Sequence, residues 1–153
     1  MLDDQFIDNT TNSFPRKSLK VLSLNVNGLA SKLLCPEFVS FLQKYDIVGL
    51  QETKTDISDT INVPGFKSYV YCRAELMRYR SGGIALFVKD SIDRHVRPDC
   101  NGRSDIIRFF TISHEVYADQ SNNESDIKCG IVYIPSSSSR FAIEDPYNEI
   151  QNE

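Results

Sequence analysis

Apolar and polar side chains alternate in a short stretch near the start of the chain. Residues 19–24, Leu-Lys-Val-Leu-Ser-Leu, have the period of two that is typical of a β-strand. The segment before them, residues 1–17, is rich in Asp, Asn, Thr and Ser and has no such period. We therefore expect a flexible segment over 1–17 and an ordered domain portion over 18–153.

A helix and a second strand are predicted next. Pro36 suits the first turn of a helix. Phe38, Phe41 and Leu42 then fall on one helical face, which predicts a helix over about 36–44. The apolar run Ile-Val-Gly-Leu that follows predicts a buried strand. Strand, helix and strand in this order predict a crossover unit whose two strands run in the same direction.

The remainder of the chain reads mainly as strands, so the fold class is α/β. Alternating or apolar runs predict four further strands, over residues 66–72, 83–88, 105–113 and 126–134. Asp145 followed by Pro146 has the composition of a helix start.

Composition and charge exclude some classes of protein. The chain is 41% hydrophobic and 25% charged, as in an ordinary globular protein. A net charge of −4 disfavours a non-specific nucleic-acid coat protein, but metal-binding carboxylates make it compatible with a nuclease. The start lacks the basic and apolar parts of a signal peptide, and no apolar run is long enough to cross a membrane. We expect an intracellular protein, nuclear or cytoplasmic, without a membrane partner.

Polar side chains follow both strands of the crossover unit. Asn25 and Asn27 come at the end of the first strand, and Glu52 comes just after the second. The carboxyl ends of neighbouring parallel strands meet at one edge of a sheet, where ligands bind in open α/β sheets. Either motif alone is more often structural, but together they predict an oxygen-rich site for Mg²⁺ or Mn²⁺.

Two other segments carry candidate chemistry. Tyr133 stands at the end of a predicted strand and can point its hydroxyl at a phosphate oxygen, although a tyrosine there is more often part of the core. Arg73, Arg78 and Arg80 lie in one loop, which predicts contacts to a phosphate backbone or simply a solvated charged loop.

Taken in order, five motifs resemble those of the endonuclease/exonuclease/phosphatase superfamily. They are LKVLSLNVNGL, YDIVGLQETKT, INVPGF, SGGIALFVKD and CGIVYIP. The resemblance extends over roughly residues 19–153 and is strongest to the apurinic-type endonuclease domain of non-LTR retrotransposons. Each motif alone is weak, but the ordered combination is specific.

The resemblance implies a four-layer α/β sandwich of the deoxyribonuclease I-like kind, here only its first part. It also implies hydrolysis of a DNA phosphodiester that depends on Mg²⁺ or Mn²⁺ and leaves a 3′-hydroxyl. By its positions, Glu52 is a metal ligand and Asn27 lies beside the metal. Asn25 orders the site, and Tyr133 hydrogen-bonds the phosphate.

The chain departs from the family pattern after Tyr133. It has neither the Asp-x-Asn motif that activates the attacking water nor the Ser-Asp-His motif near the end of the domain. Whether the chain is itself an enzyme therefore stays open, and we expect it to be inactive alone. We also expect most of the second sheet to be missing, which would expose the inner face of the first sheet and cause poor solubility or association. Its partners would be DNA and either the C-terminal half of its own domain or a reverse transcriptase domain.

Two alternatives remain. The first is a phosphatase or RNA-directed nuclease of the same superfamily, because all of these enzymes share the front half. The second is a non-catalytic remnant that binds a partner, which the two missing motifs favour. A coding sequence that continues into the Asp-x-Asn motif would exclude the remnant.

Overall fold

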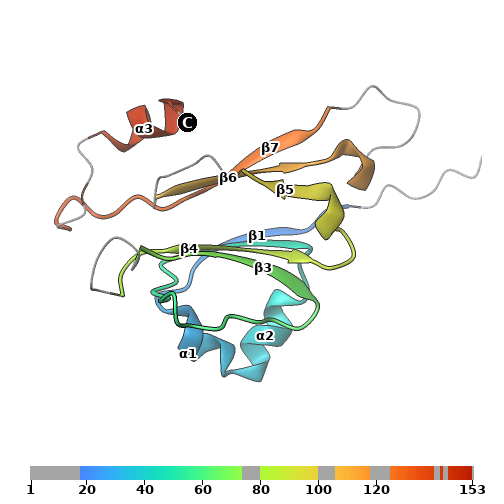
Figure 1. The fold of residues 1–153 in the computed structure, drawn as a ribbon, viewed down its shortest axis with the longest axis horizontal. Helices are drawn as coiled ribbons and strands as arrows, with labels where there is room; N and C mark the ends of the chain where they lie inside the picture. Colours follow the sequence, from blue (N-terminus) through green and yellow to red (C-terminus); the bar gives the residue numbers. More distant parts are fainter. Residues whose placement is uncertain are drawn as a thin grey trace, which may run out of the picture.

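The fold consists of two β-sheets packed face to face, with helices outside (Figure 1). The computed structural model describes residues 18–73, 80–99, 106–117, 125–139, 142 and 145–152. The expected flexible segment, 1–17, lies outside these residues.

The first sheet has the strand order β1-β2-β4-β3. Its strands are β1 (Val21–Asn25), β2 (Ile47–Gln51), β3 (Phe66–Tyr71) and β4 (Ile84–Lys89). The pairing of β1 with β2 is parallel, as the crossover unit predicts, whereas β4 runs antiparallel to both β2 and β3. The two strands whose ends carry the candidate site are thus direct neighbours.

Two short helices cover the outer face of this sheet (Figure 1). The predicted helix is α2 (Pro36–Leu42), with Pro36 in its first turn and Leu42 buried against the sheet. The other helix, α1 (Leu29–Leu33), was not predicted. Gly28 precedes it, and no side chain caps its start, so the sequence carries no helix-start signal there.

A second sheet covers the inner face of the first, which corrects the expectation of an exposed face. The second sheet consists of the antiparallel strands β5 (Val96–Pro98), β6 (Ile107–Ile112) and β7 (Ile127–Val132). Buried apolar side chains from both sheets form one cluster between them; it includes Ile47, Ile84, Leu86, Val88, Phe110, Ile112 and Ile131. The described part of the second sheet is therefore enough to bury the inner face of β2 and β4.

The two sheets approach closely where Gly49 of β2 faces Ile131 of β7. A Cβ on Gly49 would lie 2.9 Å from Cγ1 of Ile131, so only glycine fits at this spacing. Beside this contact the flank between the edge strands β1 and β7 is open, with a largely apolar cavity of about 340 Å³. Val21 of β1 stays 53% exposed there. The expectation of an uncovered face is therefore met only along β1.

The last described helix is α3 (Pro146–Asn152), at the position predicted for a helix start. The Asp145 carboxylate accepts a hydrogen bond of 3.1 Å from the Asn148 backbone N–H, as an N-terminal cap does. This role agrees with the interpretation of Asp145 as a helix-start residue.

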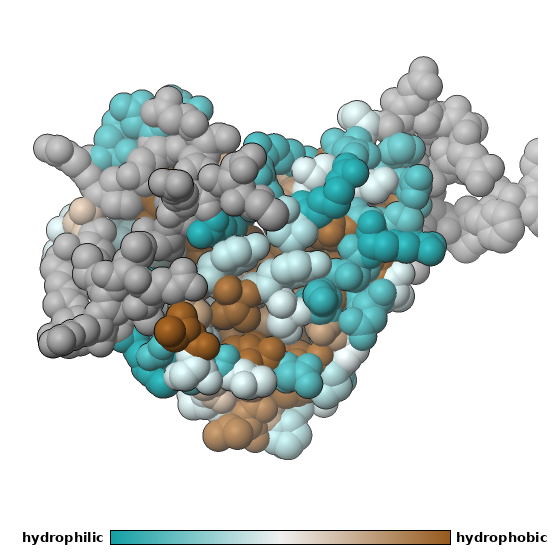
Figure 2. Space-filling view, in the orientation of Figure 1, coloured by the Kyte–Doolittle hydropathy of each residue, from teal (hydrophilic) through white to brown (hydrophobic). Residues whose placement is uncertain are grey.

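The surface in this orientation is mostly hydrophilic over the second sheet, and hydrophobic residues gather mainly lower down, over the first sheet and its helices (Figure 2). Within the described part of the chain, no helix is long and apolar enough to cross a membrane.

Candidate active site

The ends of β1 and β2 are held together by backbone hydrogen bonds beyond the sheet itself. Asn25 pairs in register with Gln51, the last residues of their strands. After them, the Gly28 N–H donates to the Glu52 carbonyl at 2.8 Å, and the Leu29 N–H donates to the Thr53 carbonyl at 2.8 Å. The loop after β1 therefore runs alongside the loop after β2 and fixes it.

Positive φ angles gather in these two loops. Asn27, Glu52 and Lys54 have φ of 45°, 52° and 50°, and they are the non-glycine residues with positive φ in the described structure. Gly28 also has a positive φ, of 103°, which glycine adopts without steric cost. A non-glycine residue in this region costs about 1–3 kcal/mol, and such strain tends to cluster at functional sites. The strain at Glu52 turns the chain sharply just where the predicted metal ligand stands.

A glycine pair holds the same loop from the other side. The N–H groups of Thr53 and Lys54 donate to the carbonyls of Gly83 and Gly82, at 3.2 and 2.8 Å. A Cβ on Gly83 would lie 2.5 Å from Oγ1 of the buried Thr53, so a larger residue does not fit. Glu52 is thus the first residue of a loop fixed on both sides by backbone contacts.

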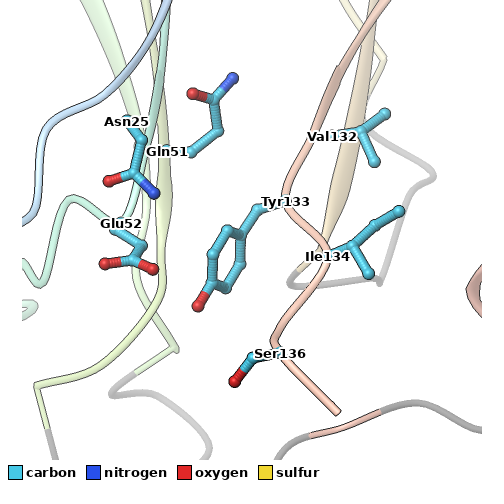
Figure 3. Close-up of a pocket in the computed structure, with 7 residues that line it drawn as sticks. All are labelled: Asn25, Gln51, Glu52, Val132, Tyr133, Ile134 and Ser136. Carbon is cyan, nitrogen blue, oxygen red and sulfur yellow. The ribbon is translucent and has the colours of Figure 1, made fainter. Parts of the chain in front are cut away.

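Asn25, Glu52 and Tyr133 line one cavity of about 490 Å³ between the ends of β2 and β7 (Figure 3). Tyr133 follows β7 directly, and its N–H donates to the Ile106 carbonyl at 2.6 Å, which holds the backbone behind the ring. The structure therefore brings together three residues that the sequence placed at three separate strand ends.

Gln51 and Ser136 also line this cavity, together with Val132 and Ile134. Sequence reasoning assigned them no role, because an amide or a hydroxyl beside a strand end is common in loops. The position of Gln51 directly before Glu52 was the one available signal. The Gln51 amide nitrogen donates to Ser23 Oγ at 2.8 Å, and the amide points away from the Glu52 carboxylate (Figure 3).

The Asn25 amide is oriented by a local hydrogen bond. Its Oδ1 accepts from the Asn27 backbone N–H at 3.1 Å. The amide nitrogen therefore faces the side of Glu52 and Tyr133 (Figure 3). Asn25 is thus placed to donate a hydrogen bond, which suits a phosphate oxygen or a carboxylate better than a metal ion.

Asn27 does not join the cavity, although it was expected beside the metal. Its Oδ1 accepts a hydrogen bond from Lys54 Nζ, and it is not among the lining residues. The positive φ of Asn27 turns the chain away from the strand direction. The amide oxygen of Asn27 is thus partnered by the ammonium group of Lys54.

The structure describes two of the three arginines of the expected phosphate-contacting loop, Arg73 and Arg80. Arg73 is only 3% exposed, so its guanidinium does not face solvent. Arg80 is exposed but forms ion pairs with Asp56 and Asp59, at 3.7 and 3.4 Å. Arg78 lies outside the described residues. Because Arg73 is buried, its side chain is not exposed for contact with a phosphate backbone; the role of the three arginines stays a prediction.

The cavity has the ligand chemistry of a hard cation site, with a single carboxylate. Glu52 offers carboxylate oxygens, and Mg²⁺ binds through one or two carboxylates together with waters and substrate phosphate. Nowhere among the described residues do three His, Cys, Asp or Glu side chains come together as a metal cluster. These residues fit a cation that shares its ligands with water and substrate, not one in a closed protein cage.

One curated relative of similar sequence is a probable RNA-directed DNA polymerase from transposon BS of Drosophila melanogaster. It is 31% identical over 77 residues, which are 50% of this chain and 8% of that protein. The chain thus spans a small part of this relative.

Two solved structures are similar in fold. The catalytic domain of Xenopus laevis APE2 aligns with a TM-score of 0.53 and 20% identity, over 77% of this chain and 46% of that one. A Neisseria 3′ phosphatase, NExo, bound to a product DNA hairpin, aligns with a TM-score of 0.46 and 18% identity, over 63% of this chain and 38% of that one. The Xenopus alignment supports the predicted deoxyribonuclease I-like α/β fold, present here as a partial domain.

The family model for the Endonuclease/Exonuclease/phosphatase family matches residues 22–124, more than half of the 153 residues. The chain belongs to the endonuclease/exonuclease/phosphatase family.

Proposed function

We propose that this chain supplies the metal-binding and phosphate-binding half of a DNA endonuclease site. The observation that carries the proposal is the convergence of Asn25, Glu52 and Tyr133 on one cavity. A carboxylate, an amide donor and a phenol at one cavity can bind a cation and the phosphate it accompanies. Family membership supports hydrolysis of a phosphate ester as the reaction.

Tyr133 and Asn25 would each donate a hydrogen bond to a bound phosphodiester. The Tyr133 hydroxyl would donate a hydrogen bond to a non-bridging phosphate oxygen, and the Asn25 N–H group would donate from the opposite side of the cavity (Figure 3). Both donors are held before substrate arrives, Asn25 by its bond to Asn27 and Tyr133 by its backbone bond to Ile106. Donors held in advance stabilise the charge that develops in the transition state at little reorganisation cost.

Glu52 is the group that would hold Mg²⁺ or Mn²⁺. A bound divalent ion supplies charge stabilisation at the phosphate and at the leaving oxygen. Asn27, whose oxygen is bonded to Lys54, has no part in this assignment.

DNA is the substrate that the sequence relative favours. That relative is a probable transposon polymerase, and this chain matches a stretch of only 77 of its residues. We therefore propose that the longest product of the coding sequence, called the parent protein below, nicks DNA. It would do so as a nuclease attached to such a polymerase would.

We further propose that cleavage needs a segment beyond the described residues. The cavity contains one carboxylate, and the open flank between β1 and β7 offers an apolar cavity of about 340 Å³ against which a further segment of the domain can pack. The alignment over 46% of the Xenopus catalytic domain supports a larger domain.

Nicking of supercoiled plasmid in Mg²⁺ tests the proposal. The chain alone and the longest product of its coding sequence are compared, each as wild type, Glu52→Gln and Glu115→Gln. Glu115 is a matched control, since its exposed carboxylate pairs with His95 after the far end of β6. We expect nicking by the longer product, a loss on the order of 100-fold or more in Glu52→Gln, and no loss in Glu115→Gln.

Other outcomes would reject parts of the proposal. Nicking that survives Glu52→Gln would remove Glu52 from the site. Hydrolysis of phosphate monoesters or RNA without DNA nicking would replace the substrate. Nicking by the chain alone would remove the need for a further segment. No hydrolysis by any product would favour a non-catalytic remnant.

A further inference from the structure

Arg73 is the most deeply buried charged side chain near the cavity. It follows β3 by two residues and is only 3% exposed. Lys, Glu, Arg and Asp are almost never fully buried unless they are paired. Removing a charge from water costs several kcal/mol unless neighbouring groups compensate. The burial of Arg73 therefore indicates a structural role among neighbouring groups rather than contact with solvent.

On one side, the guanidinium of Arg73 lies flat against Gly82. A Cβ on Gly82 would come within 2.8 Å of Cζ and 2.9 Å of Nη1 of Arg73, so the guanidinium occupies the space of a missing side chain. The Gly82 carbonyl in turn accepts the Lys54 N–H at 2.8 Å. Arg73 thereby supports the turn that fixes the loop carrying Glu52.

On the other side, the guanidinium faces the ring of Tyr133. Cζ of Arg73 lies 5.9 Å from the ring centroid. This is within the distance of about 6 Å at which a cation is attracted by an aromatic face. Tyr133 lines the same cavity as Glu52.

We propose that Arg73 is a positioning residue that sets the separation between Glu52 and Tyr133. The two residues belong to different sheets, and neither follows the other closely in sequence. Arg73 lies against Gly82, beside the first sheet, and faces the ring of Tyr133, beside the second, so one planar group connects the two segments. The predicted effect of Arg73 on the reaction rate rests on the proposed function, whereas its predicted effect on the position of Tyr133 does not.

Because Arg73 does not touch substrate, its loss should change the rate and not the affinity. A displaced tyrosine or glutamate weakens contacts that matter in the transition state, and small misplacements can lower rates by about 100-fold. Arg73→Met in the active parent protein should lower kcat by about 10- to 100-fold and change KM for DNA by less than about twofold. Arg73→Lys should recover only part of the rate, since an ammonium is not planar.

Two further variants separate positioning from simple loss of stability. Gly82→Ala keeps Arg73 but fills the space that its guanidinium occupies. It should therefore lower kcat as Arg73→Met does. In a Tyr133→Phe background, Arg73→Met still displaces the ring, but this ring has no hydroxyl. Arg73→Met should therefore lower kcat by a smaller factor there than in wild type. Arg80→Met is the control from the same loop, because the exposed Arg80 pairs with the partly buried Asp56 and Asp59 instead. Thermal unfolding confirms that each variant is folded.

A structural readout keeps the proposal testable if no activity is found. In a sample with ¹³C-labelled tyrosine, the Tyr133 ring signals, assigned with Tyr133→Phe, should shift in Arg73→Met and Gly82→Ala but not in Arg80→Met. Unchanged Tyr133 signals in folded Arg73→Met would overturn the proposal. So would a rise in KM at constant kcat, which would mean direct contact with DNA. An unaffected rate in Glu52→Gln would instead reject the proposed function. The tyrosine signals would then still test whether Arg73 positions the Tyr133 ring.

Discussion

Asn25 and Gln51 stand side by side at the ends of the parallel strands β1 and β2. This register places Glu52, the next residue after Gln51, at the same sheet edge as Asn25. Tyr133 reaches that edge from the second sheet, so the cavity is built where the two sheets end together (Figure 3).

The Tyr133 hydroxyl should contribute to catalysis without supporting the fold. Tyr133→Phe keeps the ring, and therefore its contact with Arg73, but removes the hydrogen-bond donor. Loss of one preorganised donor lowers kcat on the order of 100-fold in comparable sites. We expect such a fall in plasmid nicking by the parent protein, with an unfolding midpoint within about 2 °C of wild type. A rate within twofold of wild type would show that the phenol does not contact the phosphate.

Gly49→Ala should destabilise the packing of the two sheets. The added methyl group would lie 2.9 Å from Cγ1 of Ile131, so the sheets must separate or Ile131 must move. Overpacking of this kind costs about 1–3 kcal/mol, measurable by urea unfolding. In an Ile131→Ala background the same change should cost much less, because the clashing atoms are gone. Equal costs in both backgrounds would contradict the close approach.

Stability at high pH should depend on Tyr69. Burial, aided by the hydrogen bond from its hydroxyl to Asp93, raises the pKa of Tyr69 to about 12. The folded state therefore holds this proton more tightly than the unfolded state, whose tyrosine pKa is about 10. The contribution of Tyr69 is fully present below pH 10 and is lost as the pH rises from about 10 to 12. Urea unfolding at pH 8, 10 and 11.5 should show a smaller alkaline loss in Tyr69→Phe than in wild type, and an identical loss would contradict the prediction.

Stability at low pH should depend on Asp126. The His114 backbone N–H donates to this carboxylate, and with the His114 side chain it lowers the pKa of Asp126. A lowered folded pKa means that the contribution is present above the unfolded value of about 3.9 and is lost as the pH falls through the folded one. Asp126→Asn should therefore flatten the loss of stability below about pH 4. Identical acid unfolding curves for wild type and Asp126→Asn would show that Asp126 does not contribute to the loss of stability at low pH.

The sequence predicted the elements better than it predicted how they assemble. Alternation identified β1, an apolar run identified β2 and helical spacing identified α2, because each of these signals lies within a few consecutive residues. The prediction missed β5, a three-residue strand that ends in Pro98, and expected most of the second sheet to be absent. Which strands share a sheet depends on pairing between distant residues, such as Phe110 with Cys129, which a single sequence does not display.

The sequence predicted those parts of the candidate site that follow from the directions of the strands. Parallel strands explain why Asn25 and Glu52 meet, whereas Tyr133 was connected to them through resemblance. Arg73 was read as part of a charged loop, because nothing local shows that Gly82 leaves room for a guanidinium. The glycine pair after the arginines was the available signal.

Paramagnetic broadening by Mn²⁺ tests most directly whether Glu52 and Tyr133 form one metal-dependent site. Mn²⁺ is titrated into the chain with ¹³C-labelled tyrosine, as wild type, Glu52→Gln and Glu115→Gln. We expect the Tyr133 ring signals to broaden before those of the other tyrosines, and Glu52→Gln but not Glu115→Gln to abolish this preference. Equal broadening of all tyrosines, or selective broadening that survives Glu52→Gln, would contradict the site described here.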